Sequence, residues 1–325
     1  MKKLFILAAA IVAFASCSKE PEAIVNDGSI KFMSVQTRAT ETTDITDLKN
    51  GGFNVYGYTT GAKGYDVFTG VTATASSKPT TEGTTIWNTP VTKYWAANQT
   101  YDFVALYPIS NKATIDKTAR TATVTFNNTG EEDLVAAVAT RTTETDLAQA
   151  AVALTFKHQL ARVVVKFVNQ FETAQGFTVK VSNVALKSIP TTATFTYTNG
   201  TTTAVSATGT ADMAFSFDGA TGGVMTIGAN SEASTVYKYV IPTNAATVYK
   251  LAYKVEIYDG SELLLNTFET TAGVDLTSTT YTAGQSYLFT ANVYDVINPI
   301  NFTVEVEKWE DPTTPTGTIT IGDKK

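Results

Sequence analysis

The chain has 325 residues, a formal net charge of −6, one cysteine and one histidine. It lacks the clustered lysine and arginine that bind phosphate backbones, so we expect no nucleic-acid partner. One cysteine and one histidine exclude an internal disulfide and a zinc site of several sulfur and nitrogen ligands. Charged residues are only 17% of the chain, whereas threonine (59), tyrosine (15) and phenylalanine (17) are abundant. This composition predicts an all-β protein of about two domains.

The N-terminus is typical of an export signal. Lys2 and Lys3 precede an apolar stretch over residues 4–15, which is shorter than the roughly 20 residues of a membrane-spanning helix. The stretch ends in Phe14-Ala15-Ser16-Cys17, and small residues directly before a cysteine are typical of a bacterial lipobox. We predict a lipoprotein signal peptide over residues 1–16 and a lipid anchor on Cys17. An ordinary signal peptide that contains a cysteine is the alternative.

Residues 18–28 are polar and contain proline, which predicts a tether. Alternation of apolar and polar residues then predicts strands along the whole chain. In chain order they cover residues 29–36, 53–60, 101–107, 123–126, 152–156, 162–168, 177–186, 287–293, 302–309 and 317–322. The run over residues 162–168 is continuous enough to predict burial on both faces.

Turn residues support antiparallel pairing. Asn199-Gly200 and Asp259-Gly260 each lie between two predicted strands, and both dipeptides tolerate the positive φ angles of type I′ hairpin turns. The threonine-rich residues 201–210 lack apolar side chains to bury. We therefore expect a loop or an edge strand there.

No set of residues indicates catalysis. His158 lies between two apolar runs and is interpreted as structural. The acidic clusters, Glu131-Glu132-Asp133 and Asp44 with Asp47, lie in polar, turn-like segments, so we interpret them as solvated loops rather than as a hydrolase pair. Four aromatic residues fit either a sugar-stacking platform or core packing: Trp87, Tyr94, Trp95 and Tyr101. We predict no enzyme, no metal site and no cofactor.

Five segments, spaced over nearly all of residues 30–325, resemble the fimbrillin family of Bacteroidetes, the lipoprotein pilins of type V pili. The segments are LTFKHQLARVVVKF (154–167), KYWAANQTYDFVALYP (93–108), VSNVALKSIPTTATF (181–195), TAGQSYLFTANV (282–293) and FTVEVEKWED (302–311). The resemblance implies two tandem transthyretin-like β-sandwich domains. We place them at residues 39–157 and 158–300, followed by a candidate donor-strand tail at 301–325.

The resemblance also implies a maturation route. The lipoprotein would reach the surface of the outer membrane, where an Arg-specific protease would cut in the loop after the first strand. The matching bond joins Arg38 to Ala39, in a polar segment that a protease cleft can bind. Residues 17–38, which hold the lipidated tether and the first strand, would then leave with the anchor.

Loss of that first strand would expose an apolar groove with unpaired backbone groups. The tail of another subunit could fill it, with Phe302, Val304 and Val306 on one face and Ile319 and Ile321 repeating the pattern. Such a heterologous contact grows an open filament. We predict a structural pilin of a cell-surface fimbria that serves adhesion, with copies of itself or related subunits as partners. The alternative is a surface lipoprotein or tip adhesin that binds a host glycan or protein without polymerising.

Overall fold

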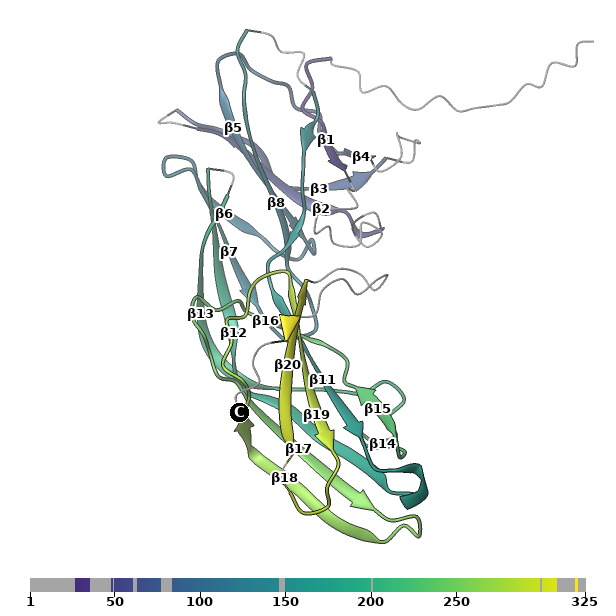
Figure 1. The fold of residues 1–325 in the computed structure, drawn as a ribbon. Coiled ribbons are helices and arrows are strands. Elements are labelled where there is room, and N and C mark those ends of the chain that lie inside the picture. Colours follow the sequence, from purple (N-terminus) through teal and green to yellow (C-terminus); the bar gives the residue numbers. More distant parts are fainter. Residues whose placement is uncertain are drawn as a thin grey trace, which may run out of the picture.

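The structure is a computed structural model, and it describes residues 27–35, 48, 50–60, 63–76, 84–145, 150–199, 201–298, 300–308 and 319–320. These residues form three β-sheets (Figure 1), which confirms the all-β class. The predicted signal peptide, Cys17, Arg38, Ala39 and Ile321 lie outside the described residues. In the described ranges no helix is both long enough and apolar enough to cross a membrane.

The first sheet is built from residues 32–158 and has eight strands in the order β10-β8-β5-β2-β3-β4-β1-β9. The strands are β1 (Phe32–Val35), β2 (Phe53–Thr59), β3 (Asp66–Ala75), β4 (Thr84–Asn88), β5 (Thr100–Tyr107), β8 (Val135–Thr142), β9 (Val152–Ala153) and β10 (Lys157–His158). Phe53 and Val55 share one buried face, as the alternation predicts. The opposite face of β2 is buried as well, because Tyr56 packs in a second core against the next sheet.

The second sheet is organised around β12 (Thr178–Thr198), a strand of 21 residues. One edge of β12 pairs first with β17 (Lys250–Tyr258) and then with β7 (Thr121–Asn127). The other strands of this sheet are β6 (Ala113–Asp116), β13 (Thr201–Ala214), β14 (Met225–Ile227) and β18 (Leu264–Asp275). The domain division at residues 157 and 158 stays a prediction. β7 precedes this division in the sequence and β12 follows it, yet the two strands are hydrogen-bonded neighbours.

The third sheet has six strands and covers the β12–β17 part of the second. It contains β11 (Ala161–Asn169), β15 (Ser231–Ser234), β16 (Lys238–Val240), β19 (Gln285–Val293), β20 (Asn301–Lys308) and β21 (Ile319–Thr320). Val165 and Phe289 of this sheet share one core with Val181 and Val255 of the second. The 3-10 turn η1 (Thr173–Gln175) follows β11.

Two sequence predictions about strands and turns need correction. In β11, Val163 and Val165 are buried, but Arg162 and Lys166 lie on a half-buried face. The charged side chains reach solvent, so burial on both faces was wrong. The hairpin at Asp259 is present, but its turn is longer than type I′. The Asp259 carboxylate accepts backbone N–H bonds two and four residues on, and Glu262 carries the positive φ.

The hairpin at Asn199 agrees with the prediction, because Asn199 has a φ of 50°. It joins β12 to β13, and β13 confirms the edge-strand alternative for the threonine-rich segment. Its residues 206–212 are exposed, because they are small or polar and have no large apolar side chain to bury.

Candidate functional site

The first strand, β1, lies inside the first sheet rather than at its edge. It pairs antiparallel with β4, with Phe32 opposite Trp87, and parallel with β9, with Phe32 opposite Val152. The Val152 amide donates to the Lys31 carbonyl at 2.7 Å, and the amide two residues further on donates to Met33 at 2.8 Å. Removing β1 would leave unpaired backbone groups on both neighbours. We call the space it fills the β1 slot, bounded by β4 and β9.

Alternate side chains of this segment point into the core. Ile30, Phe32 and Ser34 are buried, and Phe32 is 0% exposed, whereas Lys31 and Met33 between them are half-buried. This period-2 pattern is that of a strand with one face in a core. The slot therefore takes two apolar side chains and one small polar side chain at alternate positions.

Phe32 and Ser34 make the specific contacts in the slot. The ring centroid of Phe32 lies 5.5 Å from that of Phe68 and 5.4 Å from that of Phe103, both edge-to-face. The hydroxyl oxygen of Ser34 accepts a hydrogen bond from Trp87 Nε1 at 2.9 Å. Sequence reasoning missed this role of Ser34, although its spacing of two from Phe32 places it on the inward face.

The predicted donor residues that the structure describes lie in β20 and β21 of the third sheet, which does not include β1. β20 pairs with β19 along its length, and Val304 is buried opposite Phe289. Phe302 and Val306 are partly buried against the same core. β21 pairs with β20 over two residues, which places Ile319 opposite Val306. β20 is thus part of its own subunit's core, and β21 is at the end of the sheet.

The chain has four arginines, and the folded structure holds three of them. Arg120 makes two 2.9 Å contacts with the carboxylate of Asp102, through Nε and Nη2, and that carboxylate is buried. Arg141 lies within β8. Arg162 lies within β11, where its Nε donates to the Ser286 hydroxyl at 3.0 Å. The fourth arginine, Arg38, lies outside the described residues.

The Asp133 side chain is largely buried, so the solvated-loop interpretation was wrong for this residue. Its Oδ2 lies 2.5 Å from Nδ1 of His158, and the two side chains are 11% and 8% exposed. Burial raises the pKa of the Asp133 carboxyl above its usual range, and the hydrogen bond from His158 opposes that rise. The pair joins the start of β8 to β10. The described part of the chain holds no cluster of acidic, histidine or cysteine residues that could bind a metal ion.

We expect Asp133→Asn to change how stability depends on pH. Because the folded-state pKa of Asp133 is raised, this group stabilises the fold fully below about pH 4, and the contribution is lost as pH rises through the folded-state pKa. The unfolding free energy of the variant relative to wild type should therefore increase from pH 4 to pH 8. Urea unfolding followed by tryptophan fluorescence measures this, with the exposed Asp218→Asn as control. A difference that stays constant with pH contradicts the assignment.

The predicted aromatic platform is mostly core. Trp87, Trp95 and Tyr101 are buried, and the rings of Trp95 and Tyr101 lie edge-to-face at 4.9 Å. Only Tyr94 of the four is exposed, at 64%. The sugar-stacking interpretation was therefore wrong for the three buried rings, because they fill the core inside the first sheet.

The sequence model of the fimbrillin-like family matches residues 37–309. The chain belongs to the fimbrillin-like family. Fimbrillin-like proteins are structural rather than enzymatic, which agrees with the prediction that this chain is not an enzyme. Family membership also implies a place in a cell-surface fimbria and association with other fimbrial subunits.

Three solved structures are similar to this fimbrillin-like chain to different degrees, and the first of them supports the fold. A fimbrial protein from Bacteroides vulgatus has 18% sequence identity and a TM-score of 0.66, covering 87% of this chain and 99% of that one. A candidate cell adhesion protein from Bacteroides uniformis has 17% identity and a TM-score of 0.46, covering 87% and 99%. The fimbrial anchor protein Mfa2 from Porphyromonas gingivalis has 9% identity and a TM-score of 0.38, covering 86% and 98%. A comparison with curated protein sequences found no significant match.

Proposed function

We propose that this protein is a fimbrial pilin that is cut after Arg38 by an Arg-specific protease and polymerises by strand exchange, serving adhesion. The observation that carries the proposal is the position of β1 between β4 and β9. β1 precedes Arg38 in the chain, so a cut there severs it from the rest of the subunit. A strand that completes a core but can be severed is one that another subunit can replace.

The arginines support a cut at one bond. Proteases bind an extended segment of backbone, which a strand inside a sheet or a turn held by a salt bridge does not offer. Arg141 and Arg162 lie in paired strands, and Arg120 is held by Asp102. The bond after Arg38 is then the favoured target.

The end of the tail matches the slot in sequence. The slot holds three inward side chains at alternate positions. Ile30 and Phe32 are apolar, and Ser34 accepts a hydrogen bond. Ile319, Ile321 and Asp323 repeat this spacing. Phe302, Val304 and Val306 alternate in the same way, but they already pack against their own core. Ile319 is paired in its own subunit as well, but β21 contacts β20 over only two residues, so it has less pairing to give up. We therefore place Ile319 and Ile321 in the slot of the next subunit, with Asp323 as acceptor for the Trp87 indole N–H.

The lipid anchor belongs to the same proposal. Cys17 would hold the precursor in the outer membrane, and the cut after Arg38 would release the subunit into the fimbria. The support is the short apolar stretch before Cys17 and the absence of a second cysteine anywhere in the sequence. A precursor that keeps residues 17–38 would keep its slot filled by its own β1.

We expect Arg38→Ala to stay uncut and monomeric. The test incubates protein lacking residues 1–16 with an Arg-specific protease and reads the products by N-terminal sequencing and an unboiled denaturing gel. Wild type should give a new N-terminus at Ala39 and a ladder of regularly spaced bands. The control Arg141→Ala should behave like wild type. Filaments from Arg38→Ala would overturn the cleavage proposal, and a cut wild type that stays monomeric would favour the non-polymerising adhesin.

A further inference from the structure

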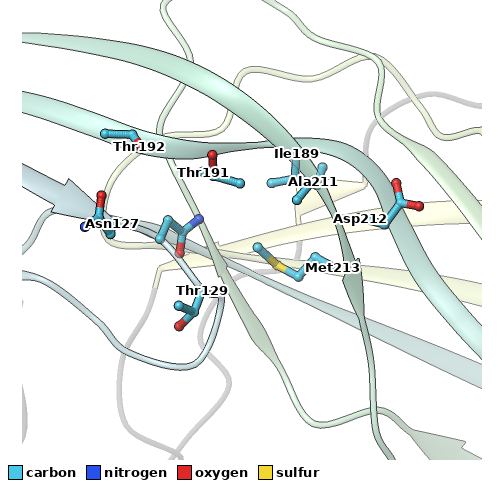
Figure 2. Close-up of a pocket in the computed structure, with 9 residues that line it drawn as sticks. Asn127, Thr129, Ile189, Thr191, Thr192, Ala211, Asp212 and Met213 are labelled. Atoms are coloured by element: carbon cyan, nitrogen blue, oxygen red, sulfur yellow. The ribbon is translucent and has the colours of Figure 1, made fainter.

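The edge of β12 has a gap where its neighbour changes. β17 pairs with β12 as far as Lys187, and pairing with β7 begins at Thr192. A hollow of about 500 Å³ lies beside this gap (Figure 2), which is within the usual range of small-ligand sites. Asn127, Thr129, Thr191 and Thr192 bring amide and hydroxyl groups to it, and the buried side chains of Ile189 and Met213 lie beneath it.

The charge at this hollow is balanced. Asp212 lines it, and its Oδ1 accepts the Ser188 backbone N–H at 3.1 Å, while its Oδ2 pairs with Nζ of Lys187. These two contacts lower the pKa of Asp212. The carboxylate is therefore held in one orientation and its charge is compensated, which favours a neutral ligand over an ionic one.

The outward face of the sheet continues from the hollow as rows of polar side chains. Strand register places Thr192 between Asn127 and Thr208, and Thr194 between Thr125 and Ser206. All six side chains are exposed or half-exposed, whereas Phe126 and Phe195 on the opposite face are buried. We call these six residues the hydroxyl face.

The hydroxyl face offers polar groups at regular intervals. Neighbouring rows lie about 6.8 Å apart along a strand, and neighbouring strands about 4.8 Å apart. A second hollow, of about 480 Å³, is also lined by Asn127, together with Thr123 and Thr125 and one charged residue of each sign, Lys112 and Glu132. The two hollows share Asn127, so a ligand longer than one unit can contact both.

We propose that the hydroxyl face and its two hollows bind a neutral oligosaccharide. Threonine, serine and asparagine side chains each donate and accept hydrogen bonds, as sugar hydroxyls do. The threonine methyl groups offer apolar contact to sugar C–H groups. The six residues of the face carry no charge, and the charged residues at the two hollows are of both signs, Asp212 with Lys187 and Lys112 with Glu132, so the site has no excess of positive charge to recruit an anionic polymer. The six residues also include none of the aromatic or arginine side chains that anchor protein partners. Oligosaccharide binding does not depend on strand exchange. The binding proposal can therefore fail while the polymerisation proposal holds, and the reverse is also possible.

The test measures binding of cellohexaose, xylohexaose and mannohexaose to the protein lacking residues 1–16, by saturation-transfer NMR and calorimetry. The acidic hexagalacturonate serves as the charged comparison. We expect saturable binding of at least one neutral hexasaccharide, weakened at least tenfold by Asn127→Ala combined with Thr192→Val. Thr271→Val changes an exposed threonine of β18, outside the hydroxyl face, and should bind as wild type does.

A conservative variant separates binding from folding. Thr192→Ser keeps the hydroxyl and should bind within about threefold of wild type, and thermal unfolding should show that all variants are folded. Three outcomes would overturn the proposal: no binding of any neutral hexasaccharide, tighter binding of the acidic one, or equal binding by the double variant.

Discussion

A subunit with Ile319→Asp and Ile321→Asp should fold and be cut after Arg38 but form no filament. In the proposed register these two side chains fill the apolar positions that Ile30 and Phe32 occupy in the precursor. Burying an isoleucine side chain contributes about 1.5–3 kcal/mol, so two of them contribute roughly 3–6 kcal/mol to each subunit contact. Placing two carboxylates there adds a desolvation cost. At about 1.4 kcal/mol per factor of ten, the contact should weaken by more than a hundredfold.

The ladder on an unboiled denaturing gel and electron microscopy of the cut protein measure this result. Thr318→Asp and Thr320→Asp form the matched control, because they add the same charge at the intervening positions of the same segment. The control should still polymerise. Filaments from the isoleucine variant would show that another segment fills the slot, and β20 would then become the donor to test.

Phe32→Ala should destabilise the precursor but leave the filament unchanged. The Phe32 ring is fully buried against Phe68 and Phe103, and removing such a ring from a core costs about 3–5 kcal/mol. After the cut, Phe32 leaves with β1 and no longer contributes. Urea unfolding of the uncut protein and heat dissociation of the filaments measure the two halves of this prediction.

Met33→Ala is the control, since Met33 lies on the other face of β1 and is half-buried. Met33→Ala should lower the unfolding free energy of the precursor by less than half as much as Phe32→Ala does. If Phe32→Ala does not fold, Phe32→Leu gives a smaller loss in the same direction. Filaments that weaken along with the precursor would mean that β1 remains in the mature subunit, which contradicts strand exchange.

Local sequence patterns were enough for many of the elements. Alternation predicted the strands that became β7 and β19, because one face of each lies on a core and burial follows the period of two. Asn199 predicted its hairpin because it tolerates a positive φ. The turn after Asp259 was harder to predict, since its carboxylate captures backbone amides and lengthens the loop.

Buried polar pairs were not visible in the sequence. Asp133 looks like part of an acidic loop, but the fold brings His158 to 2.5 Å from it. Asp102 appears as a polar residue in a strand, and Arg120 reaches it from the turn between β6 and β7. Both pairs depend on which strands become neighbours, which no local pattern of residues records.

The sequence by itself determined the all-β class, the resemblance to fimbrillins and the candidate residues Cys17, Arg38, Ile319 and Ile321, because composition, alternation and short motifs are local properties. Only the tertiary structure decided that β1 is an internal strand and that β12 changes its neighbour partway along. It also decided that Trp87, Trp95 and Tyr101 are core rather than surface. These features arise from pairing between strands far apart in the chain, and such pairing sets which face of each strand is covered.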